Sequence, residues 1–118
     1  MIEFIDGPAQ HCKSLLLRRT PLYLRVTHRE GLGGTKKTGA WDALDQLSDR
    51  ADPAETLYVY RLVETGPWLH LRMERCSGFY RRAKYRFVQD QPEDGVMRST
   101  ERWREWAEAE ARKEMPYV

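Results

Sequence analysis

Residues 78–88 read Gly78-Phe79-Tyr80-Arg81-Arg82-Ala83-Lys84-Tyr85-Arg86-Phe87-Val88, and this stretch carries four aromatic and four cationic side chains. Successive side chains of a β-strand point to opposite faces, so the stretch divides into two sets. The set able to pack on a core is Phe79, Arg81, Ala83, Tyr85 and Phe87. The other set is Tyr80, Arg82, Lys84, Arg86 and Val88, which places three successive cations on one exposed face. The pattern therefore predicts a strand with a basic outer face.

Two further strands are predicted just before this one. Thr56–Val63 is rich in β-branched and aromatic residues, Glu64–Pro67 has the composition of a turn, and Trp68–Arg75 alternates between apolar and polar side chains. These features predict a hairpin. With Cys76-Ser77-Gly78 as the next turn, they predict an antiparallel meander from Thr56 to Val88.

The N-terminal half is predicted to add shorter elements. Met1–Ile5 fits a weak edge strand, and Asp6-Gly7-Pro8 is a turn signal. Cys12–Arg18 contains three consecutive leucines and fits a buried strand, whereas Leu22–Thr27 alternates as a half-buried strand does. The three-residue spacing of Trp41, Leu44 and Leu47 predicts one or two helical turns over Ala40–Leu47.

The C-terminal segment predicts an amphipathic helix over Glu101–Glu114, with Ser99 or Thr100 as its cap. Trp103 and Trp106 share one face of this helix and are expected to dock it onto the sheet. The expected wall of the sheet is formed by Phe79, Tyr85 and Phe87. The fold class is thus predicted as α+β, mainly β: a small antiparallel curled sheet or partly open barrel of five to six strands, with a short mid-chain helix and a packed C-terminal helix.

Length and composition predict a single domain over residues 1–118. Hydrophobic residues make up 41% of the chain and charged residues 32%, and no apolar run approaches the ~20 residues that a membrane span needs. The acidic N-terminus does not resemble a signal peptide. We therefore expect a cytoplasmic protein without a membrane partner, in which Cys12 and Cys76 are reduced thiols, although a bridge between the two remains an alternative.

Charge is unevenly distributed although the net charge is only +2. His11–Lys37 holds seven Lys or Arg residues and one acid, and Arg72–Arg86 holds six and one. If the two basic blocks meet in space, they form a positive face. Ordinary solvated strand faces give the same pattern.

Motifs for cofactors and metals fail on spacing. The glycine-rich segment Gly31–Gly39 is not a P-loop, because the second required glycine falls on Lys36. The acids between Asp42 and Glu55 lack the alternation and central glycine of a calcium loop. The histidines and cysteines lack the paired spacing of a zinc site. The sequence predicts no cofactor and no metal.

A catalytic constellation is also not predicted. Adjacent His11 and Cys12 on a strand point to opposite faces, and no glycine-flanked serine elbow is present. Metal-free ribonuclease chemistry remains an alternative, because it needs only a base and phosphate-stabilising cations. The residues that would supply it are His70, Arg72, Tyr80 and Arg82.

Several stretches resemble short uncharacterised accessory proteins encoded by actinobacterial phages and prophages. They are Trp41–Leu47, Tyr58–Arg61, Gly78-Phe79-Tyr80 and Trp103–Ala107. The similarity spans most of the chain. It implies a small protein made in a host cytoplasm that binds a host or defence protein, or nucleic acid, and it carries over no catalytic residue.

The leading hypothesis is a non-enzymatic binding module that engages a host or defence protein, because nucleic-acid-binding domains usually have a more lopsided charge. The alternative is nucleic-acid binding, with Tyr80 stacking on a base and the cations holding phosphates. The predicted binding residues are Tyr80, Arg82, Lys84 and Arg86, assisted by Lys36 and Lys37.

Overall fold

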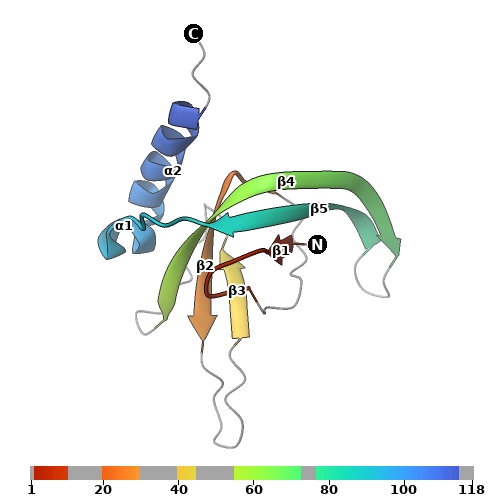
Figure 1. Ribbon diagram of the computed structural model, residues 1–118, viewed down its shortest axis with the longest axis horizontal. Coiled ribbons are helices and arrows are strands. Elements are labelled where there is room, and N and C mark those ends of the chain that lie inside the picture. Colours follow the sequence, from red (N-terminus) through yellow and green to blue (C-terminus); the bar gives the residue numbers. More distant parts are fainter. Residues whose placement is uncertain (1, 11–19, 30–39, 45–54, 73–76, 115–118) are drawn as a thin grey trace, which may run out of the picture.

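The computed structural model describes residues 2–10, 20–29, 40–44, 55–72 and 77–114 (Figure 1). In chain order the elements are β1 (Ile2–Phe4), β2 (Tyr23–Arg29), β3 (Ala40–Leu44), β4 (Thr56–Arg72), β5 (Ser77–Phe87), α1 (Asp94–Arg98) and α2 (Thr100–Glu114). The strands form an open sheet and α2 packs against it, so the predicted α+β, mainly β class is confirmed.

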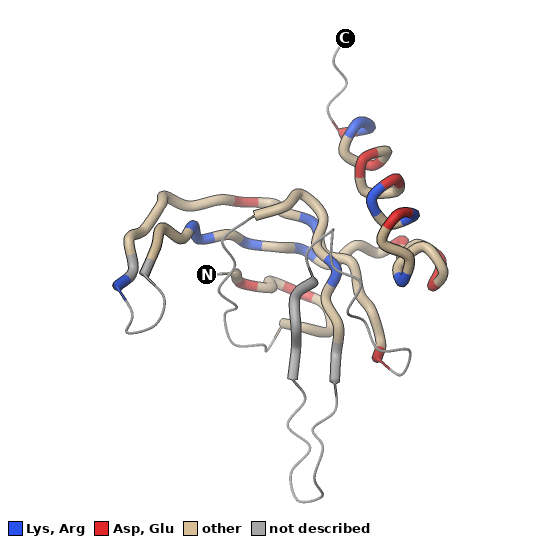
Figure 2. The backbone as a smooth tube through the Cα atoms, turned by 180° about the vertical axis from the view of Figure 1, so that it is seen from behind, with Lys and Arg blue, Asp and Glu red and all other residues tan. Residues whose placement is uncertain are grey.

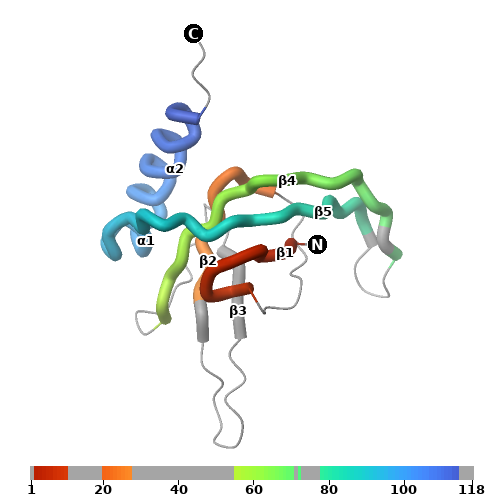
Figure 3. Tube along the Cα trace, in the orientation of Figure 1, coloured from red at the N-terminus to blue at the C-terminus, as the bar shows by residue number. Residues whose placement is uncertain are grey.

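The sheet has the strand order β1-β5-β4-β2-β3. All neighbours are antiparallel except β1 and β5, which run parallel with Ile2 opposite Ala83 and Phe4 opposite Tyr85. β1 is an edge strand, as predicted. It has 3 residues against the 11 of β5, and it lies beside only part of the C-terminal half of that strand (Figure 3).

The predicted hairpin between Thr56–Val63 and Trp68–Arg75 is wrong. These residues, as far as Arg72, form one continuous strand of 17 residues, and both of its halves pair with β5. Register shifts between Leu62 and Glu64 and between Thr65 and Trp68 each absorb an extra residue, and Gly66-Pro67 lies in the second. Such bulges bend and twist a strand without reversing it. The result is the arch of β4 and β5 in Figure 1.

The predicted helix over Ala40–Leu47 is also wrong where the structure describes it. Ala40–Leu44 is the strand β3, antiparallel to β2, with Leu44 opposite Arg25 and Ala40 opposite Arg29. A three-residue apolar spacing over so short a segment does not exclude a strand. Pairing with β3 satisfies the outer backbone groups of β2, which a short helix would leave open. The predicted strand Cys12–Arg18 lies outside the described residues.

Two apolar clusters cover opposite faces of the sheet. The first contains Ile2, Phe4, Ala9, Leu24, Val26, Tyr60, Ala83 and Tyr85. The second contains Tyr23, Val59, Met97, Trp103 and Ala107. β2 is therefore buried on both faces and not half-buried as predicted, because the helices cover the side that its alternation assigns to solvent.

Helix α2 forms and docks as predicted, but on the other face of the sheet. The backbone N–H of Arg102 donates to Ser99 Oγ at 3.3 Å, so Ser99 caps the first turn. Trp103 is fully buried in the second cluster. The predicted wall is wrong, since Tyr85 and Phe87 pack in the first cluster and Phe79 is exposed. Alternation places Val59, not Tyr85, on the side that α2 covers.

Candidate binding surface on the β4–β5 arm

The predicted cationic row of β5 lies in solvent. Arg82, Lys84 and Arg86 are exposed, whereas Ala83 and Tyr85 between them are buried. Arg86 lies opposite Arg61 on β4, and so on the face that α2 covers further along the sheet. α2 contacts the sheet around Tyr23 and Val59 and leaves the cations uncovered. The alternation read from the sequence is correct for this half of β5.

Alternation does not predict burial in the first half of β5. Tyr80 is only 5% exposed, whereas its neighbour Phe79 is 66% exposed. Tyr80 was predicted to stack on a nucleic-acid base, and this role is wrong for the folded chain because a stacking ring needs an open face. The outward aromatic residue is Phe79, on the opposite side of the strand.

Acids flank the cationic row. Lys84 Nζ lies 3.6 Å from Glu64 Oε2, and Arg86 Nε lies 3.8 Å from Asp6 Oδ2, with all four side chains partly or mostly exposed. Figure 2 shows β5 as a line of basic residues with acidic positions on the neighbouring strands. Such exposed pairs add little stability, but they offset the positive charge of the row. The surface is therefore mixed in charge and not a uniform phosphate track.

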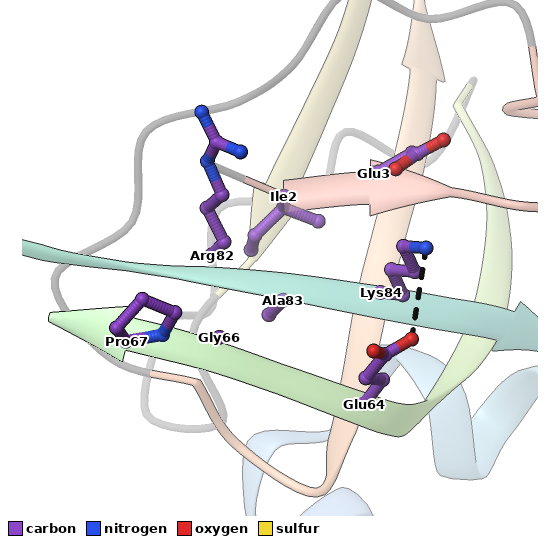
Figure 4. A pocket seen from close by; sticks show the side chains of 8 residues that line it. All are labelled: Ile2, Glu3, Glu64, Gly66, Pro67, Arg82, Ala83 and Lys84. Atoms are coloured by element: carbon purple, nitrogen blue, oxygen red, sulfur yellow. Dashed lines mark ion pairs between the residues drawn. The ribbon is translucent and has the colours of Figure 1, made fainter. Parts of the chain in front are cut away.

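Arg82 is the exception in this row. Its side chain has no hydrogen bond or ion pair with any residue that the structure describes. It lines a shallow hollow of about 490 Å³ with Glu3, Glu64, Gly66, Pro67 and Lys84 (Figure 4). The missing side chain of Gly66 allows this approach, because a Cβ there would meet Arg82 Cβ at 3.0 Å. The Arg82 side chain extends away from the Lys84–Glu64 pair, toward the β1 side of β5.

The far ends of β4 and β5, residues Gly66–Arg72 and Ser77–Arg82, form a two-stranded extension that we call the arm (Figure 1). One face of the arm is aromatic. Trp68 is 55% exposed and lies opposite Arg81, while His70 lies opposite the exposed Phe79. We call Trp68, His70, Phe79 and Arg81 the aromatic patch.

Polar contacts hold the aromatic patch in place. The Arg81 guanidinium stacks 5.6 Å from the Trp68 ring centre and donates from Nε to the Gly66 carbonyl at 3.0 Å. The His70 and Phe79 rings are 4.8 Å apart. Exposed aromatic rings held by neighbours lose less conformational entropy on binding than mobile ones, so the patch is preorganised.

The remaining predicted site residues do not join this surface. Lys36 and Lys37 lie outside the described residues. Arg25, from the first basic block, is fully buried, with Nη1 donating to the Met97 carbonyl at 2.8 Å and the guanidinium 5.4 Å from the Trp103 ring. It stabilises the helix layer and adds nothing to a positive face.

The residues proposed for ribonuclease chemistry are separated. His70 lies opposite Phe79, whereas Tyr80 and Arg82 point to the other face of β5. Arg72 is two residues from His70 on the same face of β4, so only Tyr80 and Arg82 are separated from the base. The structure therefore does not bring all four residues together on one face.

A second hollow lies between α2 and the sheet. Glu114 Oε1 accepts a hydrogen bond from the Tyr23 hydroxyl at 2.7 Å and lies 2.6 Å from Arg61 Nε. Two causes raise the pKa of Tyr23 to about 12: burial is the larger, and the hydrogen bond to Glu114 is the second. The hydrogen bond to Glu114 also raises the pKa of Arg61 above its usual value. These contacts join the end of α2 to β2 and β4, so we assign them a structural role.

Metal ligands do not cluster in the part of the chain that the structure describes: no three His, Cys, Asp or Glu side chains come together there. Within the same residues, no helix has the length and apolar character needed to cross a membrane. No protein-family model, curated protein or solved structure matches this chain.

The aromatic patch is the feature that reasoning from sequence missed. Phe79 was predicted to face the core, and Trp68 was placed on the preceding strand of the predicted meander. The available signal was cross-strand pairing: antiparallel pairing of 68–72 with 77–81 places the two aromatic residues on one face. The predicted meander already contains this pairing; the error was to assign Phe79 to the core-facing side.

Proposed function

We propose that this protein is a non-enzymatic binding module that recognises another protein through the arm. The observation that supports this most strongly is the exposure of Trp68 and Phe79, held by Arg81 and His70. Monomeric proteins rarely place grouped large aromatic residues in solvent without a binding role. Tryptophan and arginine are also enriched among the residues that dominate protein–protein affinity.

The partner class follows from the resemblance to phage accessory proteins. A host or defence protein is the occupant that this resemblance implies. The mixed charge around Lys84 and Arg86 suits a protein surface, which offers both signs, better than the uniform phosphate charge of nucleic acid.

Binding of nucleic acid is the alternative, and the exposed row of Arg82, Lys84 and Arg86 favours it. Because Tyr80 is buried, the stacking contact predicted for this alternative is lost and only the phosphate contacts of the cations support it. The two functions differ in salt dependence, since phosphate contacts release counterions.

Capture experiments test the proposal. The wild-type chain, a Trp68→Ala/Phe79→Ala double variant and a Val63→Ala control are immobilised and exposed to lysate of an actinobacterial host. Val63 is a suitable control because it is an exposed apolar residue of β4 outside the arm. We expect the wild type and Val63→Ala to capture the same host protein. The double variant should capture at least ~10-fold less of it, because two aromatic anchors are truncated.

Fluorescence anisotropy with single-stranded and duplex DNA and RNA at two salt concentrations completes the test. Tight binding that falls steeply with salt, and that survives the double variant, would favour the nucleic-acid alternative. If the double variant retains every protein that the wild type captures, the aromatic patch is not the binding surface and the proposal is wrong.

A further inference from the structure

The arm has an open backbone edge. β1 pairs with Ala83, Lys84 and Tyr85 of β5, and no other strand among the described residues lies beside β5 on that edge from Ser77 to Arg82. Figures 1 and 3 show β5 continuing well past β1. An uncovered strand edge presents a row of backbone donors and acceptors to which another strand can pair.

The direction of the backbone groups follows from the contacts on β1. Ile5 N–H donates to the Tyr85 carbonyl at 3.0 Å, and Phe87 N–H donates to Asp6 Oδ1 at 2.6 Å, so odd-numbered residues of β5 face this edge. Backbone groups alternate along a strand. The N–H and C=O of Phe79 therefore point to the open edge, while those of Tyr80 point to β4.

The arm itself carries charge of one sign, although Glu3 and Glu64 lie at its base and share the hollow with Arg82. The charged residues of the arm that the structure describes are Arg72, Arg81 and Arg82, with no acid among them. Figure 2 shows basic and no acidic positions in these sections, with acidic positions further along β4 and on β1. Arg82 projects toward the β1 side without an ion pair to a described residue. A strand added here meets Arg82 on one face and Phe79 on the other.

We propose that the open edge of β5 takes an acidic, extended peptide segment of a partner protein as an added strand. Acidic side chains of that segment face Arg82, and apolar side chains alternate with them and cover Phe79. Main-chain hydrogen bonds to β5 give affinity and the two side-chain rows give specificity, as in other β-strand additions. This inference rests on the proposed protein-binding function and adds the chemistry of the partner.

A synthetic probe tests the inference directly. It is a fluorescein-labelled, end-capped peptide of four alternating Glu-Val pairs, titrated into the full chain by anisotropy. The chain carries any affinity tag at its C-terminus, because the parallel β1 starts beside Ala83 and an N-terminal tag would be brought to the open edge. We expect saturable binding, and binding at least ~10-fold weaker for the matched Lys-Val peptide.

Backbone methylation separates strand addition from other modes. N-methylation of every second amide removes the N–H groups on one side of an extended peptide. One methylated set should lose binding at least ~10-fold and the other should retain it, since only one set faces β5. Hydrogen exchange gives the same information from the protein: the Phe79 amide should slow on binding and the Tyr80 amide should not change.

Charge reversal tests the role of Arg82. Arg82→Glu should lower the affinity for the Glu-Val peptide at least ~10-fold and raise the affinity for the Lys-Val peptide. The matched control is Arg104→Glu, which makes the same change on an exposed position of α2 and should have no effect.

The outcomes separate this inference from the proposed function. If both methylated peptides bind equally, or if Glu-Val and Lys-Val peptides bind alike, strand addition of an acidic segment is wrong. If no peptide binds but host proteins are still captured through Trp68 and Phe79, the inference fails and the binding function stands. If peptide binding and capture both fail, both proposals are wrong.

Discussion

Gly7 shows how a single residue fixes the path of the chain out of β1. It is the residue of the predicted Asp6-Gly7-Pro8 turn that adopts a positive φ, of 73°. A Cβ there would lie 2.6 Å from Phe87 Cβ and 2.8 Å from the Tyr60 hydroxyl. That hydroxyl donates to the Asp6 carbonyl at 3.0 Å and accepts from Ala9 N–H at 2.8 Å, so the turn is tied to β4.

Substitution of Gly7 is expected to destabilise the protein. Gly7→Ala combines a disfavoured backbone conformation with a clash against Phe87, and we expect a loss of about 2–4 kcal/mol in the free energy of unfolding. Urea denaturation measures the change. The matched control is Gly95→Ala in α1, where the new methyl meets only the flexible end of Arg102 and helix propensity improves. Equal losses for the two variants would contradict this explanation.

Sequence patterns at the residue scale predict the inner half of β5 and not the arm. Ala83 and Tyr85 are buried, and Arg82, Lys84 and Arg86 are exposed, as alternation predicts. Alternation assigns residues to two faces but does not say which face is covered. That depends on layers from distant parts of the chain, so Phe79 and Tyr80 have the opposite exposure to that expected.

At the scale of elements, the end of α2 is held by the contacts of Glu114 with Tyr23 and Arg61. The hydrogen bond requires a neutral Tyr23 hydroxyl. The folded state raises the pKa of Tyr23 from 10.0 to about 12, so it binds this proton more tightly than the unfolded state does. The resulting stabilisation is fully present below pH 10 and is lost as the pH rises toward 12.

Tyr23→Phe is therefore expected to have a pH-dependent effect. It should lower the free energy of unfolding by about 1 kcal/mol at pH 8, the typical contribution of one hydrogen bond. The difference from wild type should shrink between pH 10 and 12. Burial also raises the pKa of Tyr85, but this residue is common to both proteins and cancels in the difference. Urea denaturation at pH 8 and 11 measures the effect.

Glu114→Gln supplies the matched control. It removes the carboxylate charge but keeps an acceptor, so the Tyr23 phenol should titrate at lower pH, followed by its absorbance at 295 nm. The pKa should stay above 10, since burial is the largest cause of the shift. A difference between Tyr23→Phe and wild type that stays constant from pH 8 to 12 would show that the phenol proton is not linked to folding.

Elements with strong local signals were predicted well, and those decided by pairing were not. α2 has good helix formers, a serine cap and two tryptophans on one face, and it forms where predicted. The break at Gly66-Pro67 becomes a bulge because β5 is long enough to pair across it. β3 is a strand because β2 needs a partner on its outer edge. Pairing partners far apart in the sequence are not contained in a local pattern.

At the scale of the whole molecule, β2 and β4 join the two apolar clusters. Leu24 and Tyr60 face the first cluster, while Tyr23 and Val59, one residue away on the same strands, face the second. Neither strand can unfold without exposing both clusters. We therefore expect residues 2–10, 20–29, 55–65 and 83–114 to unfold in one cooperative transition.

Mild substitutions in each cluster test this cooperativity. Phe4→Leu in the first cluster and Ala107→Gly in the second should each cost about 1–2 kcal/mol. Tryptophan fluorescence is expected to follow the second cluster through Trp103 and Trp106, and far-UV circular dichroism follows the whole fold. Phe4→Leu should shift both urea midpoints equally, although Phe4 belongs to the other cluster. If Phe4→Leu leaves the fluorescence midpoint unchanged while Ala107→Gly shifts it, α2 and its cluster unfold separately. The two faces of the sheet would then be independent.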